Sequence, residues 1–394
     1  MVLRSDGVAG NKRRKKEQTE YFFDYTLLFI VLFLLGFGLV MVYSVSSYEA
    51  YADYNDAAYY LKKQLLAGII GLVAMIITAN VPYKWWMHFT FLAYVVSLGL
   101  IALVPFFGKE VNGAKRWLII PGIGMSVQPA EIAKLAMILV LAQLVCKMGK
   151  SVRTFKGMLF LMMVSAPPVA MVLFCTRNLS SAIIILGIAV LMIFVADPKY
   201  KKYIIVGLLA VALVAGLIYY ISTLEMSSDL HYRLRRVLAW MNPEDFIDEE
   251  GYQTLQALYA IGSGGIWGKG LGQSMQKLGF IPEAQNDMIF SIICEELGLF
   301  GAIAIIIMFV MLLWRMMVIA NNAPDLFGAL IVVGVMGHIA IQVILNIAVV
   351  TNTIPNTGIS LPFISYGGTS VLFLLIEIGL VLSVAKRIQL KEVN

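Results

Sequence analysis

The sequence predicts an all-α protein: a polytopic bundle of about ten transmembrane helices. Of its 394 residues, 60% are hydrophobic and only 14% are charged. A soluble domain contains about 45–50% apolar and about 25% charged residues. A soluble core of this size cannot bury so much apolar surface, so lipid must surround most of the chain.

Apolar stretches recur along the chain at the length that a helix needs to cross a bilayer, which is about 20 residues. They predict spans near residues 25–45, 62–80, 87–106, 131–146, 157–175, 179–196, 203–222, 288–314, 327–351 and 361–385. In the region of the fourth to sixth spans, Asn178 and the pair Pro167-Pro168 interrupt the pattern, which leaves open a broken or re-entrant helix there.

The distribution of basic residues predicts the orientation of the chain. A basic run, 12–16, precedes the first span, and further Lys and Arg follow the last one. Because an even number of spans places both termini on one side and basic residues favour the cytoplasm, we expect both termini to be cytoplasmic. A basic run beside a membrane helix is typical of a membrane anchor, so we expect no binding of nucleic acid.

These observations predict three segments. Residues 1–24 form a cytoplasmic basic tail, residues 25–386 form the ten-span membrane domain, and residues 387–394 form a second cytoplasmic tail. The membrane domain carries one long extracellular loop, 223–286, which is dense in mixed charge. A long polar loop on a compact scaffold is usually functional, and we expect this one to be so.

A carboxylate, Asp287, lies at the outer mouth of the eighth expected span. The acid pair Glu295-Glu296 lies about 12 Å deeper along the same helix, at 1.5 Å per residue. Acids at that depth normally face a polar cavity or a partner. On residue type alone, Asp287 is best explained as a helix cap and the glutamates as members of structural ion pairs.

A second polar group opens the fourth expected span. Pro129 suits the first turn of a helix, and Glu131 and Lys134 are i, i+3 neighbours that can pair on one helix face. On the residues alone, we interpret this group as an ion pair at a helix start.

Basic side chains also gather on the expected outer side, against the usual topology bias. Anionic lipid headgroups and a phosphorylated substrate are both suitable targets, and the unusual location favours the substrate. The residues are Lys115, Arg116, Arg233, Arg235, Arg236, Lys269 and Lys277. The glycine-rich segment 262–272 lacks the spacing of a phosphate loop, and we reject nucleotide binding there. The run 365–370, which begins with Ser365, suits close helix packing.

Taken together and in order, these motifs resemble the SEDS family of bacterial cell-wall proteins over nearly the whole chain after residue 20. Two of them, 276–277 and 282–284, favour the cell-division branch over the elongation branch, with the sporulation branch close. One position departs from the family, because Asn178 stands where an Asp is frequent. The matching segments are 112–117, 128–131 with Lys134, Arg236 with 242–243, 251–253, 268–272, 276–277, 282–284 with Asp287, 295–298, 355–358, 361–363 and 365–368.

The resemblance implies a peptidoglycan glycosyltransferase that polymerises lipid II at the outer face of the cytoplasmic membrane, at the division septum. It implies a class B penicillin-binding protein (a transpeptidase), other division proteins and membrane lipids as partners. It also makes Asp287 the catalytic general base, in place of the helix-cap interpretation, and gives functional roles to Glu131 and Lys134. For substrate binding we add Lys115, Arg116, Arg236, Lys269, Lys277 and Ser365. Mg²⁺ or Mn²⁺ is a candidate cofactor.

Two other functions remain open from the sequence. Buried acids and interrupted helices also suit a lipid II flippase, which would line the whole membrane thickness with polar groups. The polar motifs cluster outside, although Glu295, Glu296 and Glu377 fit the flippase better. A non-enzymatic division scaffold that recruits the transpeptidase would give Asp287 no special role.

Overall fold

The computed structural model describes residues 23–111, 114–119, 126–197, 201–222, 232–246 and 251–388. Within them, 9 helices are long and apolar enough to cross a membrane. These are α1 (Tyr25–Tyr54), α2 (Tyr59–Asn80), α4 (Thr90–Phe107), α5 (Pro129–Met148), α6 (Phe155–Cys175), α7 (Leu179–Ala196), α11 (Ile289–Asn321), α12 (Leu326–Val350) and α13 (Gly368–Ala385). A further helix, α8 (Lys201–Ser222), occupies the seventh expected span. The prediction of an all-α bundle with about ten spans is therefore confirmed.

Short elements connect the long helices. They are α3 (Tyr83–Trp86), α9 (Tyr232–Met241), α10 (Tyr252–Gly264), the 3-10 helices η1 (Gly149–Arg153) and η2 (Pro243–Phe246), and the strands β1 (Gly108–Val111), β2 (Ala114–Ile119) and β3 (Ser126–Val127). The strands form a small antiparallel sheet in the order β1-β2-β3, which the sequence analysis did not anticipate. The basic run 12–16 lies outside the described residues.

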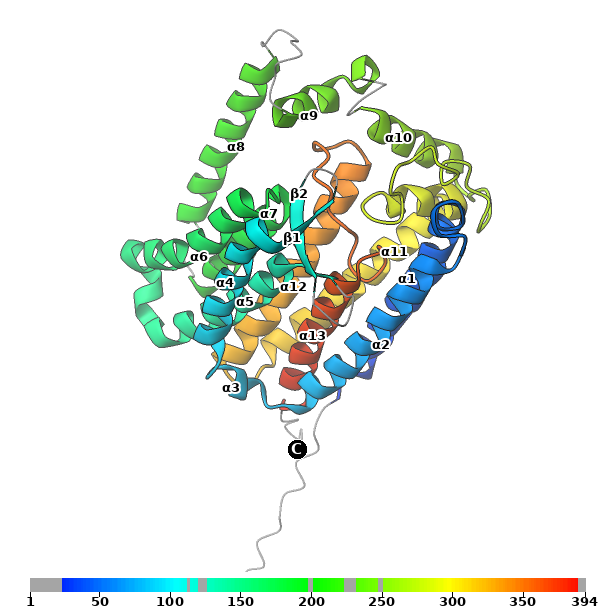
Figure 1. Cartoon of the computed structure of the whole chain (residues 1–394). Coiled ribbons are helices and arrows are strands. Elements are labelled where there is room, and N and C mark those ends of the chain that lie inside the picture. The colour runs from blue at the N-terminus through cyan, green and yellow to red at the C-terminus, as the bar shows by residue number, and fades with distance from the viewer. Residues whose placement is uncertain are drawn as a thin grey trace, which may run out of the picture.

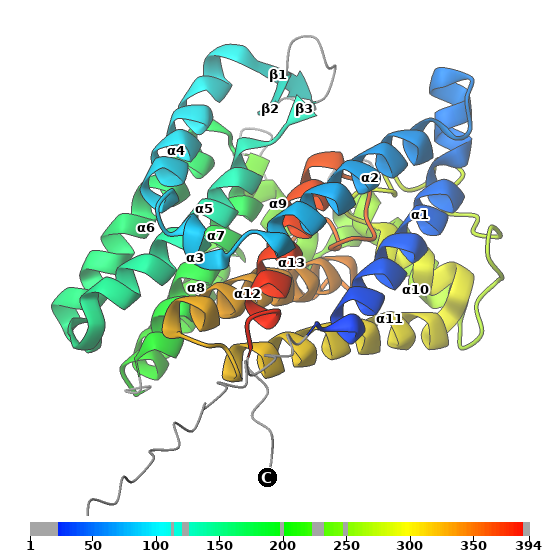
Figure 2. The ribbon, with the colours of Figure 1, turned by 90° about the horizontal axis from the view of Figure 1, so that it is seen from below.

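The helices pack around α12, which contacts α5, α7, α11 and α13. Helices α1, α2 and α13 lie on one side of it and α4, α6 and α7 on the other, as Figure 2 shows from below. Helix α8 stands apart at the periphery (Figure 1). Helix α1 begins, and α13 ends, at the same end of the bundle, where Arg315 pairs with Asp24 at 2.6 Å. We call the opposite end the site end.

Helices α1 and α11 contact each other at two levels, and the distance between these levels can be compared with the thickness of a bilayer. The pair Asp24–Arg315 lies at one level, and Ser44 donates to Glu296 at 2.9 Å at the other. Along each helix the two levels are about 30 Å apart, at 1.5 Å per residue, which matches the hydrocarbon core of a bilayer. Glu296 therefore lies about one hydrocarbon-core thickness away from the Asp24–Arg315 pair.

The interruption expected at Pro167-Pro168 is absent, because α6 continues through both prolines. Pro168 has no N–H for the carbonyl of Val164, and the hydroxyl of Tyr94 donates to that carbonyl instead, at 2.8 Å. The broken helix is α11, at Gly298, where φ is 66° and ψ is −165°. Asn178 caps α7 by accepting from Ser181 N–H at 3.0 Å.

The last expected span, 361–385, starts too early, since α13 begins only at Gly368. Phe363 has a positive φ of 63°, which a right-handed helix cannot include. Residues 351–367 therefore form a loop at the site end.

Candidate functional site

The loop 351–367, between α12 and α13, is held by amide side chains that project from buried helix positions. Asn346 donates to the carbonyls of Ile359 (2.6 Å) and Asp287 (2.8 Å). Gln342, one turn deeper on α12, donates to the carbonyl of Ser360 at 2.9 Å. Gln64 of α2 binds the other end of the loop, where it donates to Ser365 O at 3.1 Å. Helices α2 and α12 thereby fix the loop against the segment that carries Asp287.

Asp287 lies in the turn before α11, with its side chain partly exposed. The N-cap of α11 is Met288, and no side chain caps this helix. Gly358 faces the carboxylate, since a Cβ there would lie 3.6 Å from Asp287 Oδ2. The helix-cap interpretation of Asp287 is wrong, because the N-cap residue is Met288.

Helix α9 brings Arg236 to the same loop. Its guanidinium donates to the carbonyl of Asn356 at 3.2 Å, and Trp240, one turn later, donates to that of Asn352 at 2.9 Å. The amide of Asn356 donates to Gln253 of α10 at 2.8 Å. Among the predicted cations whose side chains the structure describes, Arg236 is the one whose charge acts on Asp287.

Burial raises the pKa of Asp287 to about 6. A hydrogen bond from its own backbone N–H lowers the pKa, the negative charge of Glu283 raises it further, and the positive charge of Arg236 lowers it. A carboxylate with a pKa near the working pH is suited to accept a proton, because it is both ionised and basic.

The expected ion pair between Glu131 and Lys134 is present at the start of α5. Lys134 Nζ lies 2.7 Å from Glu131 Oε1, and the two side chains are 2% and 5% exposed. The second oxygen, Glu131 Oε2, is buried and has no hydrogen-bond partner within the described structure. A buried carboxylate oxygen without a hydrogen-bond partner is rare in a folded protein.

Two of the predicted substrate cations have partners inside the protein. Lys269 pairs with Glu295 at 2.7 Å and Lys277 with Glu296 at 2.8 Å. Both glutamates are fully buried, so the lysines neutralise them in place. The prediction of structural ion pairing for the glutamates is confirmed.

The remaining predicted residues make hydrogen bonds to backbone groups of the protein. Lys115 and Arg116 are on β2, where Lys115 donates to the carbonyl of Pro105 at 3.2 Å and Arg116 to that of Arg177 at 3.5 Å. Ser365 is buried and accepts from Leu361 N–H at 2.7 Å, so it shapes the loop 351–367. The described residues contain no group of three or more His, Cys, Asp or Glu side chains that could hold a metal ion.

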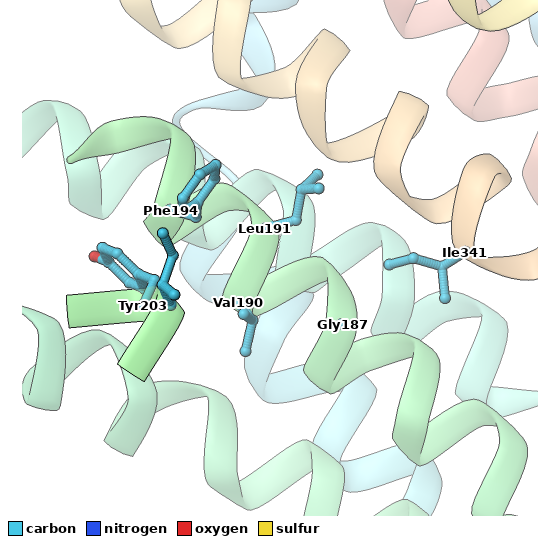
Figure 3. A pocket seen from close by; sticks show the side chains of 7 residues that line it. Gly187, Val190, Leu191, Phe194, Tyr203 and Ile341 are labelled. Atoms are coloured by element: carbon cyan, nitrogen blue, oxygen red, sulfur yellow. The ribbon is translucent and has the colours of Figure 1, made fainter. Parts of the chain in front are cut away.

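An apolar groove opens between α7, α8 and α12 (Figure 3). Its walls come from Val190, Leu191 and Phe194 of α7, Tyr203 of α8 and Ile341 of α12. A groove with such walls suits a hydrocarbon chain and offers little to a sugar.

Comparison with known proteins agrees with this architecture. The model of the cell cycle protein family that comprises FtsW, RodA and SpoVE matches residues 25–390. The chain belongs to this family, the SEDS family. It is 38% identical to stage V sporulation protein E of Bacillus subtilis, covering 92% of the chain and 97% of the relative. It is also 38% identical to the probable peptidoglycan glycosyltransferase FtsW of Geobacter metallireducens, covering 93% and 96%.

Solved structures of the family share the fold. A peptidoglycan synthase complex, described as coordinating polymerization and crosslinking, contains a chain with a TM-score of 0.75 and 27% identity, covering 92% of this chain and 97% of that one. RodA of Thermus thermophilus gives a TM-score of 0.67 at 25% identity, covering 94% and 98%.

Proposed function

We propose that the chain is a peptidoglycan glycosyltransferase that polymerises lipid II into glycan strands during cell division, with its site end on the outer face of the cytoplasmic membrane. The relatives named peptidoglycan glycosyltransferase support the activity. The observation that carries the proposal is that Asp287, a carboxylate with a pKa raised to about 6, lies against the loop 351–367, which Arg236 of α9 also contacts.

In the reaction, the Asp287 carboxylate takes the proton from the 4-hydroxyl of an acceptor lipid II. The hydroxyl oxygen attacks the anomeric carbon of the growing strand, and the bond to the lipid diphosphate breaks. General-base assistance of this kind contributes about 10²–10⁴-fold. A single carboxylate acting in this way suits direct displacement with inversion.

Positive charge near Asp287 stabilises the leaving diphosphate as its charge develops. We propose Arg236 for this role, which its contact with the loop 351–367 supports. The Glu131–Lys134 pair lies at the first turn of α5 with both side chains buried, so the role we propose for it is to position the groups around it and not to touch the substrate. We also propose Mg²⁺ or Mn²⁺ as a cofactor, which would supply further positive charge to the substrate diphosphate.

The flippase receives less support from the structure than from the sequence. The three buried acids that favoured it each have a local partner: Glu295 with Lys269, Glu296 with Lys277, and Glu377 with His338 at 2.8 Å. Paired in this way, the acids are held by partners inside the bundle, which supports a structural role for them more than a path for a headgroup.

A class B penicillin-binding protein is the proposed partner, and the solved synthase complex of a related chain supports this. Coupling of the two proteins at the septum would place polymerisation beside crosslinking.

Asp287→Asn tests the proposal. It keeps the size of the side chain and removes its basicity, and α11 keeps its Met288 cap. We expect the variant to fold, to bind its transpeptidase and to make no glycan polymer from lipid II, measured on the purified complex.

Polymer made by Asp287→Asn at a rate near that of the wild type would exclude the general base. Normal polymerisation with lost lipid II translocation would favour the flippase. Loss of transpeptidase binding alone would favour the scaffold.

A further inference from the structure

Helix α11 consists of two helices that meet at Gly298. The φ of 66° and ψ of −165° at this residue lie outside the helical region. Residues 289–297 therefore form a separate half-helix of about two and a half turns. Asp287 lies just before one end of this half-helix, and the break lies at the other.

A glycine-rich loop, 264–272, fills the break with its backbone. It supplies the hydrogen bonds that the two helix ends cannot make with each other, as a membrane setting requires. The four bonds join Lys269 N–H to Glu295 O (2.9 Å), Gly270 N–H to Glu296 O (2.9 Å), Leu299 N–H to Gly265 O (3.0 Å) and Phe300 N–H to Ile266 O (3.3 Å).

The approach of this loop is close enough to require glycine. A Cβ on Gly264 would lie 2.0 Å from the carbonyl oxygen of Cys294, and one on Gly268 would lie 2.3 Å from that of Glu296. Both distances are shorter than any real contact. The half-helix is therefore clamped at its inner end by backbone that no larger residue could supply.

Two carboxylates at the break add a second set of bonds. Glu296 accepts from Lys277 Nζ at 2.8 Å and from Ser44 Oγ of α1 at 2.9 Å, and Lys277 also donates to Ser44 at 3.1 Å. Glu295 accepts from Lys269 at 2.7 Å and from Ser274. Lys277, with a side chain only 8% exposed, is thereby tied to both α1 and α11.

We infer that the Lys277–Glu296 ion pair is a brace that positions Asp287 from the far end of the half-helix, and that Lys277 is a positioning residue and does not bind substrate. A short helix moves as one body, so a shift at the Lys277–Glu296 pair also shifts Asp287 at the other end of the half-helix. The two ends are about 14 Å apart. A displacement of about 1 Å at a reacting group costs on the order of 10²-fold in rate. This inference rests on the proposed function of Asp287.

A double-mutant cycle separates positioning from substrate binding. Its variants are Lys277→Met, Glu296→Gln and the two combined, assayed for polymerisation with purified lipid II in the complex with the transpeptidase. For a brace, we expect each single change to lower kcat by about tenfold to a hundredfold with KM little changed. The double variant should be no slower than the worse single variant, because each change already breaks the same bond.

Direct binding of substrate by Lys277 gives a different result. Lys277→Met would then raise KM, Glu296→Gln would not, and the two effects would multiply in the double variant. That outcome would overturn the inference. Lys62→Met is the matched control, because it removes a cation from an exposed ion pair with Asp56 (2.7 Å), and it should leave both constants unchanged.

A pH profile provides a readout that a general loss of stability would not move. The midpoint of kcat/KM should shift in Lys277→Met, since the surroundings of Asp287 change with the tilt of the half-helix. An unshifted midpoint together with lowered kcat would contradict the brace.

If Lys277→Met fails to fold, the exchange Lys277→Arg with Glu296→Asp serves the same purpose, because a longer cation compensates for a shorter acid. Recovery of kcat in this pair supports the brace, and multiplied losses refute it. Activity retained in Asp287→Asn would exclude the general base while leaving non-additivity in the cycle intact, so the two proposals fail separately.

Discussion

At the scale of single residues, the proposed chemistry requires that the carboxylate of Asp287 is basic and still ionised at the working pH. Burial raises the pKa of Asp287 to about 6, and the positive charge of Arg236 limits the rise. An ordinary Asp titrates near pH ~4 and would be a weaker base. Because the folded state favours the protonated form of Asp287, a fall in pH through 6 stabilises the fold at this residue. Loss of activity on mild acidification would therefore report protonation and not unfolding through Asp287.

We predict that kcat/KM for polymerisation falls about tenfold per pH unit below a midpoint near pH 6, since the base must be ionised. In Arg236→Met the midpoint should move to higher pH, because the cation that lowers the pKa is gone. Rates measured from pH 4.5 to 8, at about the same ionic strength throughout, test both statements. A midpoint near pH ~4 in the wild type would show that Asp287 is not perturbed in the working enzyme.

Glu131 and Lys134 should behave as a unit, since both side chains are buried and 2.7 Å apart. Removal of either partner leaves an uncompensated charge in a dry place, which costs about 3–5 kcal/mol. We expect Glu131→Ala and Lys134→Ala each to impair polymerisation and thermal stability, with a coupling energy of about 1–3 kcal/mol in the double-mutant cycle. Zero coupling would show that the pair does not act together.

The site residues differ in how well the sequence could reveal them. Asp287 and the Glu131–Lys134 pair stand in ordered family motifs, and the i, i+3 spacing alone predicted the pairing. The amides that build the loop 351–367 were missed. Gln64, Gln342 and Asn346 stand singly inside apolar helices, and their bonds reach residues 13 to 301 positions away. A lone polar residue within an apolar span signals a buried partner, but it does not identify that partner.

At the scale of elements, the position of the spans was predictable and the position of the break was not. Span positions follow from apolar length, which is a local property. A proline pair was the stronger local signal for a break, yet Tyr94 satisfies the carbonyl that Pro168 exposes. The true break at Gly298 depends on the loop 264–272. This loop is too far from Gly298 in the sequence for a local pattern to reveal the contact. The start of α13 was misplaced for a similar reason, because residues 361–367 are apolar but held as a loop.

Gly298→Ala tests the break in α11. A Cβ there would lie 2.3 Å from Gly268 N, and the backbone conformation is one that essentially only glycine adopts. We expect a destabilisation of roughly 1–3 kcal/mol or more, seen as a lower Tm in detergent, with reduced polymerisation. Gly36→Ala is the control: no atom lies within 4 Å of its Cβ position, so the helix should tolerate the change. An unchanged Tm in Gly298→Ala would mean that α11 can straighten without cost.

At the scale of the whole molecule, one face of α11 exposes a row of large apolar side chains. Ile303, Ile307, Val310 and Trp314 recur at helical spacing and are 45%, 51%, 58% and 67% exposed. Lipid covers such a face equally well, so hydrophobicity alone provides no drive for association, and close packing must supply it. We propose that the single membrane helix of the transpeptidase docks here, beside α11 and α12.

Photo-crosslinking tests this docking. A crosslinker at Ile307 or Val310 should give an adduct with the transpeptidase. One at Phe160, which is 47% exposed, should give none, because α6 lies across the bundle from α11 (Figure 1). Val310→Trp should weaken the complex, because the bulkier side chain disrupts the close packing between the two helices. In lipid, no hydrophobic drive for association compensates for that loss. Adducts confined to α6 or to α1 and α2 would place the partner elsewhere. The brace at Glu296 would then have no direct link to the docking face, whereas docking on α11 would connect the transpeptidase to Asp287 through one broken helix.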